Sequence, residues 1–139
     1  MQLRFLGKNS TSGDCPTLYA TDRDTYLVQG WRVFANDLLM QLDVPEGQTV
    51  VEVPTELFEH LEKDGLPSGE IRRLEDPIMI LTPGGTFVVQ GLEVTDPEAL
   101  AQMTIPDYET VVEVPKTVII ALLEAPRGAD LQRRAQPAL

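Results

Sequence analysis

Two glutamates and two glutamines stand at matching places in this chain, and their types and spacing could support chemistry. Glu52 and Glu113 each lie in a Thr-Val-Val-Glu-Val-Pro motif, and Gln29 and Gln90 each precede a glycine. Paired carboxylates can transfer protons or hold a cation, and a glutamine amide could bind a ligand. The alternative is structural: the glutamates face solvent on half-buried strands, and the glutamines satisfy backbone groups beside the glycines.

The other chemical groups of interest are a single cysteine, Cys15, and a single histidine, His60. One cysteine cannot form an internal disulfide or a thiolate metal cage, and one histidine rules out most histidine-based metal sites and proton shuttles. The sequence contains no EF-hand, Walker or dinucleotide-binding motif. We therefore expect no catalytic residue, no metal and no cofactor, and the balance favours a protein that is not an enzyme.

The net charge of the chain limits the classes of macromolecule that it can bind. The chain has 139 residues, of which 42% are hydrophobic, and 22 acidic residues outnumber 11 basic ones to give a net charge of -11. A packed domain is expected, and general binding to nucleic acid is disfavoured because phosphates attract a basic surface.

The start of the chain lacks the features of a secretory signal, and the longest apolar run, Val118–Leu123, is too short to span a membrane. We expect a cytoplasmic protein without a membrane segment.

The elements that must position these residues are predicted by an internal repeat. Residues 16–61 align without a gap on residues 77–122, at an offset of 61, with 17 identities in 46 positions. Chance matching gives about one identity in fifteen to twenty. A weaker match, Gln2–Leu6 with Glu70–Leu74, extends the alignment backwards. The sequence predicts one duplicated domain over 1–125, with repeat one at 2–64, a linker at 64–69, repeat two at 70–125 and a flexible tail at 126–139.

Each repeat is expected to run β-β-β-α-β-α. In the first repeat this predicts strands at 3–6, 17–20, 26–33 and 50–53, a short helix capped by Asn36, and a last helix after Pro54. In the second, Asp96 and Pro97 start the short helix, 111–114 is the strand, and Pro115 precedes the last helix. Hairpin turns are expected at 21–24 and 82–85.

The last segment of each repeat differs in character. Thr55–Glu62 is amphipathic, with Leu57, Phe58 and Leu61 on one stripe, whereas Lys116–Glu124 is apolar nearly all round. The second segment must therefore be buried on more than one side, either against the first repeat or against another chain. The predicted fold is α+β, with the two repeats packed around a pseudo-two-fold axis, because about 60 residues rarely bury enough surface alone.

A second set of residues could make contacts between the repeats or with a partner. Arg32 and Glu93 occupy equivalent positions with opposite charges, so a bridge near the axis is expected. The apolar run places Val118, Ile119 and Ile120 as contact residues, between the repeats or in a homodimer.

Part of the chain resembles a family. Pro16–Asp22, Tyr26–Trp31 and Val50–Pro54 are similar to small acidic actinobacterial proteins of unknown function, which are encoded beside helix-turn-helix regulators. The resemblance covers most of residues 1–62 and implies a regulatory or antitoxin-like accessory role.

The predicted architecture also resembles the duplicated cradle-loop barrels, including double-psi and swapped-hairpin forms. Val51–Leu57 is similar to the strand-proline-helix segment of swapped-hairpin DNA-binding antitoxins. Those proteins carry a basic face, whereas residues 1–125 here carry a charge of -13. The charge therefore speaks against DNA binding by that route. The alternative fold, which the architectural resemblance implies, is a cradle-loop or double-psi-like β-barrel with short helices.

Two functions are expected from these features. The first is a non-catalytic regulatory or accessory protein whose acidic face docks a basic protein partner. The alternative is a small-molecule binder or minor enzyme with a site between the repeats, near Gln29, Gln90, Glu52 and Glu113. Mimicry of DNA by the acidic surface ranks behind both.

Overall fold

A computed structural model describes residues 1–8, 16–33, 44–66, 69–72, 74 and 78–124. The strands are β1 (Leu3–Lys8), β2 (Thr17–Thr21), β3 (Thr25–Arg32), β4 (Gln48–Pro54), β5 (Met79–Leu81), β6 (Thr86–Glu93) and β7 (Glu109–Pro115). The helices are the 3-10 helix η1 (Thr55–Asp64) and the α-helices α2 (Pro97–Ala101) and α3 (Lys116–Leu123). The fold is therefore mixed and rich in sheet, with short helices. Within the described ranges, no helix has the length and apolar character needed to cross a membrane.

The seven strands form one antiparallel sheet in which β4 and β7 each pair mainly with a strand from the other half of the chain. The order is β1-β2-β3-β4-β6-β5, and β7 pairs with both β3 and β6. β4 follows β3 in sequence but pairs along its whole length with β6, and β7 pairs along its length with β3. β3 meets β4, and β6 meets β7, over two residue pairs each. The four strands β3, β4, β6 and β7 thus close a ring of pairings.

The two long pairings share one register. Thr25 opposes Pro115 on β3 and β7, and Thr86 opposes Pro54 on β6 and β4. Both members of the first pair lie 61 positions from the corresponding members of the second. The stretches that match in sequence therefore occupy corresponding positions in the sheet.

Gly30 and Gly91 allow the strands to cross closely. A Cβ on Gly30 would lie 2.6 Å from the carbonyl oxygen of Glu52, and a Cβ on Gly91 would lie 2.7 Å from that of Glu113. Real Cβ atoms do not approach a carbonyl oxygen this closely, so only glycine fits at these two positions. Gln29 and Gln90 therefore each stand beside a close contact between two backbones.

The predicted strand ends, helix starts and turn after β5 are confirmed. β4 and β7 end at Pro54 and Pro115, and a helix begins at the next residue in each case. Asp96 caps α2 by accepting a hydrogen bond from the backbone of Glu98. The turn after β5 places Gly85 at a φ of 86°, the left-handed region that glycine adopts without strain. The predicted cap at Asn36 lies outside the described residues.

One expectation about elements is wrong. The sequence match predicts a strand like β1 at Glu70–Leu74, but the described residues there are not in a strand, and the backbone N–H of Arg72 donates to Leu122 on α3. A five-residue similarity is too short to specify a pairing partner. The predicted helix after Pro54 is present as the 3-10 helix η1, and its buried stripe is the predicted Leu57, Phe58 and Leu61.

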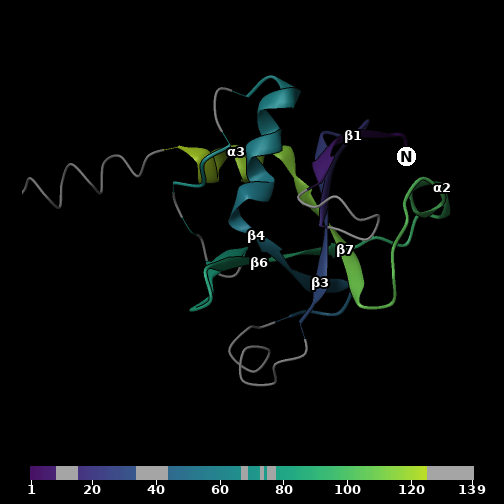
Figure 1. Cartoon of the computed structure of the whole chain (residues 1–139). Coiled ribbons are helices and arrows are strands. Elements are labelled where there is room, and N and C mark those ends of the chain that lie inside the picture. The colour runs from purple at the N-terminus through teal and green to yellow at the C-terminus, as the bar shows by residue number, and fades with distance from the viewer. Residues whose placement is uncertain (9–15, 34–43, 67–68, 73, 75–77, 125–139) are drawn as a thin grey trace, which may run out of the picture.

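Core residues lie on both faces of β3, β4, β6 and β7. The main cluster holds Tyr26, Val28, Val51 and Val53 with their counterparts on β6 and β7, and η1 and α3 pack against it through Phe58 and Ile119 among others. A smaller cluster lies on the other face under α2, around Leu27, Ala99 and Val111. In Figure 1, α2 accordingly lies away from η1 and close to the N-terminus.

Candidate functional site

Glu52 and Glu113 are held by threonines on the strands opposite. The hydroxyl of Thr25 donates to Oε2 of Glu113 at 2.7 Å, and that of Thr86 donates to Oε2 of Glu52 at 2.5 Å. Arg23 adds a longer ion pair to Glu113, with Nε 3.7 Å from Oε2. Glu113 is buried and Glu52 half-buried, so neither is a freely solvated side chain. Each carboxylate binds the threonine that begins a strand in the other half of the chain, which favours a role in fixing the strand ends.

Gln29 and Gln90 are buried and also act within the sheet. Nε2 of Gln29 donates to Oε1 of Glu109 at 2.7 Å and to the carbonyl oxygen of Thr104 at 2.8 Å. Nε2 of Gln90 donates to Oε1 of Gln48 at 3.0 Å. Glu109 is fully buried, and sequence reasoning missed it. Its signal was the alignment of Glu109 with Gln48, which places a polar side chain beside each glutamine.

Arg32 and Glu93 take separate backbone partners. Nε of Arg32 donates to the carbonyl oxygen of Asp107 at 2.9 Å, and its backbone N–H donates to Tyr108. The backbone N–H of Glu93 donates to Gly47. The ion pairs of the described chain do not include one between Arg32 and Glu93. Nothing in this geometry supports the expected bridge.

The apolar run after Pro115 divides between the core and an open surface. Ile119 is fully buried in the main cluster, so it makes contacts within the chain. Val118 packs at the edge of that cluster, and Ile120 is half-buried. Val118 borders a hollow in the surface.

A charged cluster that the sequence did not reveal joins the two halves of the chain. Asp64, at the end of η1, accepts hydrogen bonds from the hydroxyl of Tyr26 at 2.6 Å and from Nζ of Lys116 at 3.0 Å. Arg4 on β1 also bonds Asp64. Nζ of Lys116 lies 5.3 Å from the centre of the Tyr26 ring, within cation–π range. We call these four residues the Asp64 cluster.

The cluster shifts the titration of both its acidic members. Burial by itself raises the pKa of Asp64, but hydrogen bonds from Tyr26, Lys116 and Arg4 outweigh it and lower the pKa to about 2. Burial and then the bond to the Asp64 carboxylate raise the pKa of the Tyr26 hydroxyl. At neutral pH Asp64 is therefore ionised and Tyr26 donates to it. This is a stabilising arrangement, in which the pKa of Asp64 and the pKa of Tyr26 both move away from pH 7.

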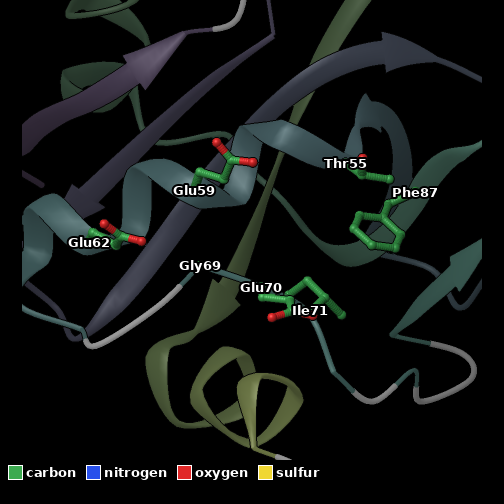
Figure 2. A pocket seen from close by; sticks show the side chains of 7 residues that line it. All are labelled: Thr55, Glu59, Glu62, Gly69, Glu70, Ile71 and Phe87. Atoms are coloured by element: carbon green, nitrogen blue, oxygen red, sulfur yellow. The ribbon is translucent and has the colours of Figure 1, made fainter.

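A groove of about 370 Å³ lies beside η1. Figure 2 shows Thr55 and Phe87 at one end, Glu59 and Glu62 along η1, and Glu70 and Ile71 on the chain segment opposite. We call it the acidic groove, after Glu59, Glu62 and Glu70. Gly69 also lines the groove, and a Cβ there would lie 1.9 Å from the carbonyl oxygen of Phe58.

A second opening, of about 440 Å³, is mostly apolar, and we call it the apolar hollow. Its lining residues are Gln48, Ile78, Gln90, Gly91, Leu92, Glu113, Val114, Pro115 and Val118. The hydrogen-bonded pair of Gln48 and Gln90 supplies its side-chain amides. Two of the four residues predicted for a ligand site, Gln90 and Glu113, border this hollow, whereas Gln29 and Glu52 do not.

Neither opening has the side chains of a metal site. Among the described residues, no group of three or more histidine, cysteine, aspartate or glutamate side chains is arranged to hold a metal ion. His60 packs on Gly7 and contacts Lys63, and burial, followed by that lysine's charge, lowers the pKa of its ring. Cys15 lies outside the described residues. Comparison with known protein families, curated proteins and solved structures finds no match.

Proposed function

We propose that this protein is a non-catalytic binding protein that docks a basic protein partner on the carboxylates of the acidic groove. The observation that carries the proposal is the charge balance there. Among the described residues, no ion pair is formed by Glu59 or Glu62. Both glutamates are exposed on one side of η1.

The net charge of the whole chain supports the same partner class. A net charge of -11 attracts basic surfaces over a distance of about 10 Å at 0.1 M salt and repels acidic ones. Contacts between exposed charges contribute mainly to association rate and specificity, and salt weakens them. A partner held on this groove should therefore dissociate as the salt concentration rises.

The test is capture of the partner from a lysate of the native cells with matched variants as bait. The wild type, the groove variant Glu59→Gln/Glu62→Gln and the control Glu46→Gln/Glu124→Gln are compared at low and high salt. The control changes net charge equally at exposed residues outside the groove. We expect one dominant basic protein on the wild type and control, eluted by salt, and several-fold less on the groove variant. Equal capture by all three contradicts the proposal.

The alternative function, binding of a small molecule, is favoured by one observation, the apolar hollow. Its volume lies within the range of ligand pockets, and its apolar walls carry an amide pair, a common arrangement for small organic ligands. Val118→Phe would fill it. If a ligand from the cell co-purifies with the wild type and not with Val118→Phe, the small-molecule function replaces the first. Absence of any co-purified ligand disfavours it.

We also propose that residues 2–64 and 70–125 are an internal duplication related by a pseudo-two-fold axis, with β3, β4, β6 and β7 as a small closed barrel. Sequence identity, strand register and hydrogen bonds all follow the same offset: Thr25 binds Glu113 as Thr86 binds Glu52. An experimental structure tests this. Residues 25–33 with 110–115 should superpose on 86–94 with 49–54, and failure to superpose would contradict it.

A further inference from the structure

The residues that line the apolar hollow have counterparts in the first half of the chain that are packed more tightly. Every lining residue lies within the stretches that match in sequence, 16–61 and 77–122. Leu57 and Glu109 are fully buried, whereas their counterparts at the hollow, Val118 and Gln48, are half-buried. Positions that match in sequence are therefore closed in one half and open in the other.

The side chains at the hollow are smaller than their counterparts at two positions. Leu92 opposes Gln48 in the β4–β6 pairing, just as Trp31 opposes Glu109 in the β3–β7 pairing. The second half thus has a leucine where the first has an indole ring, and Val118 stands where the first half has a leucine. Smaller side chains leave space that the surrounding structure refills only in part. The missing bulk is that of an aromatic ring system, and this indicates the shape of a ligand that fits.

The polar groups at the hollow define the hydrogen bonding and the charge of the ligand. Oε1 of Gln48 accepts from Gln90, so Nε2 of Gln48 keeps two N–H donors, and the hydrogen bonds of the described residues include none donated by that group. The carboxylate of Glu113 borders the hollow and, with a net charge of -11, repels an anion. Thr25 and Arg23 already bind that carboxylate, so a cation gains little there. These groups favour a neutral ligand with a hydrogen-bond acceptor.

We propose that the apolar hollow binds a small neutral aromatic molecule, with its ring against Leu92 and Val118 and an acceptor atom bonded to Nε2 of Gln48. This inference rests on the alternative function, binding of a small molecule, and names the class of ligand. It does not depend on docking at the acidic groove. A hollow of about 440 Å³ has room for a compound of two fused rings.

The probe for the test is quinoline, a neutral compound of two fused rings whose ring nitrogen accepts a hydrogen bond. It is titrated into the whole protein at pH 7 and followed by the methyl NMR signals of Leu92 and Val118. Two compounds of similar size are compared with it: indole, whose nitrogen donates rather than accepts, and quinaldate, which adds a carboxylate. We expect quinoline to bind at millimolar concentration, to shift both methyl signals by its ring current, and to bind several-fold more tightly than either comparison compound.

Two substitutions give the hollow the residues of the first half. Leu92→Trp restores the aromatic bulk and should weaken quinoline binding by about tenfold or more, because the side chain of the protein takes up the space. Gln48→Glu keeps an acceptor for Gln90 but removes the N–H donors, and should weaken binding by about threefold or more. Leu81→Trp is the control, because it makes the same exchange at an exposed leucine outside the hollow, and it should bind quinoline like the wild type.

The outcomes separate the ligand class from the small-molecule function. If quinoline fails to bind the wild type at millimolar concentration, or binds Leu92→Trp as well as it binds Leu81→Trp, the inference is overturned. If Gln48→Glu binds quinoline like the wild type, or if quinaldate binds as tightly as quinoline, the assigned hydrogen bond or charge is wrong and the inference falls with it. Co-purification of a cellular ligand with the wild type and not with Val118→Phe decides the small-molecule function independently of these results.

Discussion

The rings of Tyr26 and Phe87 occupy corresponding places in the sheet, yet only Tyr26, in the Asp64 cluster, carries a lysine of the chain, whereas Phe87 borders the acidic groove. In the first, the Asp64 side chain is 5% exposed and has three partners from distant parts of the sequence. In the second, Phe87 borders an opening lined by glutamates. One strand register therefore supports two outcomes, an internal bond network and an open surface. A lysine or a threonine after the strand-ending proline makes the difference.

The largest expected effect compares Leu57 with Val118, which stand three residues after Pro54 and Pro115. Leu57 is fully buried, whereas Val118 borders the apolar hollow. Leu57→Ala should lower the free energy of unfolding by about 3 kcal/mol, and Val118→Ala by about 1 kcal/mol or less, because a cavity costs most where the site cannot relax or admit water. Urea unfolding measures both. Equal losses would show that the two halves are packed alike.

The next largest effect is expected when Asp64 is removed. Asp64→Ala leaves the Tyr26 hydroxyl, Lys116 and Arg4 without their common acceptor, and we expect a loss of about 2 kcal/mol in the free energy of unfolding. Glu62→Ala, at an exposed residue of the same helix, is the control and should change it by less than about 0.5 kcal/mol. A similar loss in both variants would indicate damage to η1 rather than to the cluster.

The same variant should alter the pH dependence of stability. The pKa of Asp64 is lowered from 3.8 to about 2, so its contribution is complete above about pH 4 and is lost as the pH falls towards 2. The difference in unfolding free energy between wild type and Asp64→Ala should therefore shrink over this interval. Parallel stability curves from pH 5 to pH 2 would contradict the bonding described for Asp64.

Reciprocal exchange of the two rings gives a smaller effect. Tyr26→Phe removes the hydroxyl bound to Asp64 and should cost about 1.5 kcal/mol, because that bond is to a charged group. Phe87 is buried against Phe58 and its ring makes no hydrogen bond, so Phe87→Tyr breaks none and should cost less, about 0.5 kcal/mol, because the ring also borders the groove. Thermal or urea unfolding tests the difference, and equal costs would remove the distinction between the two positions.

The smallest expected difference in stability is between the two threonine–glutamate hydrogen bonds, which are alike in the two halves of the chain. Thr25→Val and Thr86→Val each break one threonine–glutamate hydrogen bond, and each should cost about 1 kcal/mol, with the two values within about 0.5 kcal/mol of each other. Urea unfolding of the two variants side by side measures both costs. Clearly unequal losses would mean that the two hydrogen bonds contribute differently to stability although the strands share one register.

Features that depend on one or two neighbouring residues were predictable from the sequence. Pro54 and Pro115 end strands because proline lacks the N–H that would continue pairing, and Asp96 with Pro97 begins α2 for similar local reasons. Gly30 could be assigned to a close backbone contact because a glycine within an apolar strand leaves room for another strand to approach.

The bonding of the candidate residues was not predictable, because their partners come from distant segments. Glu113 binds a threonine 88 positions away, and Gln29 binds Glu109, which is 80 positions away. The Asp64 cluster has no counterpart in the aligned sequence: Lys116 aligns with a threonine, and the position aligned with Asp64 is an alanine. Residues that only one repeat possesses cannot be found from the positions that the two repeats share.

The exchange of strands between the two halves also bears on synthesis of the protein on the ribosome. β3 is made early, but the strand that pairs along it from Thr25 to Trp31 is β7, whose last residue is Pro115. Until that point the nascent chain carries a long apolar strand edge without its partner, a state in which chains associate wrongly. Folding must wait for contacts of high sequence separation, and it should therefore be slow for a chain of this size. Translation to Pro115 is the earliest moment at which the sheet can close.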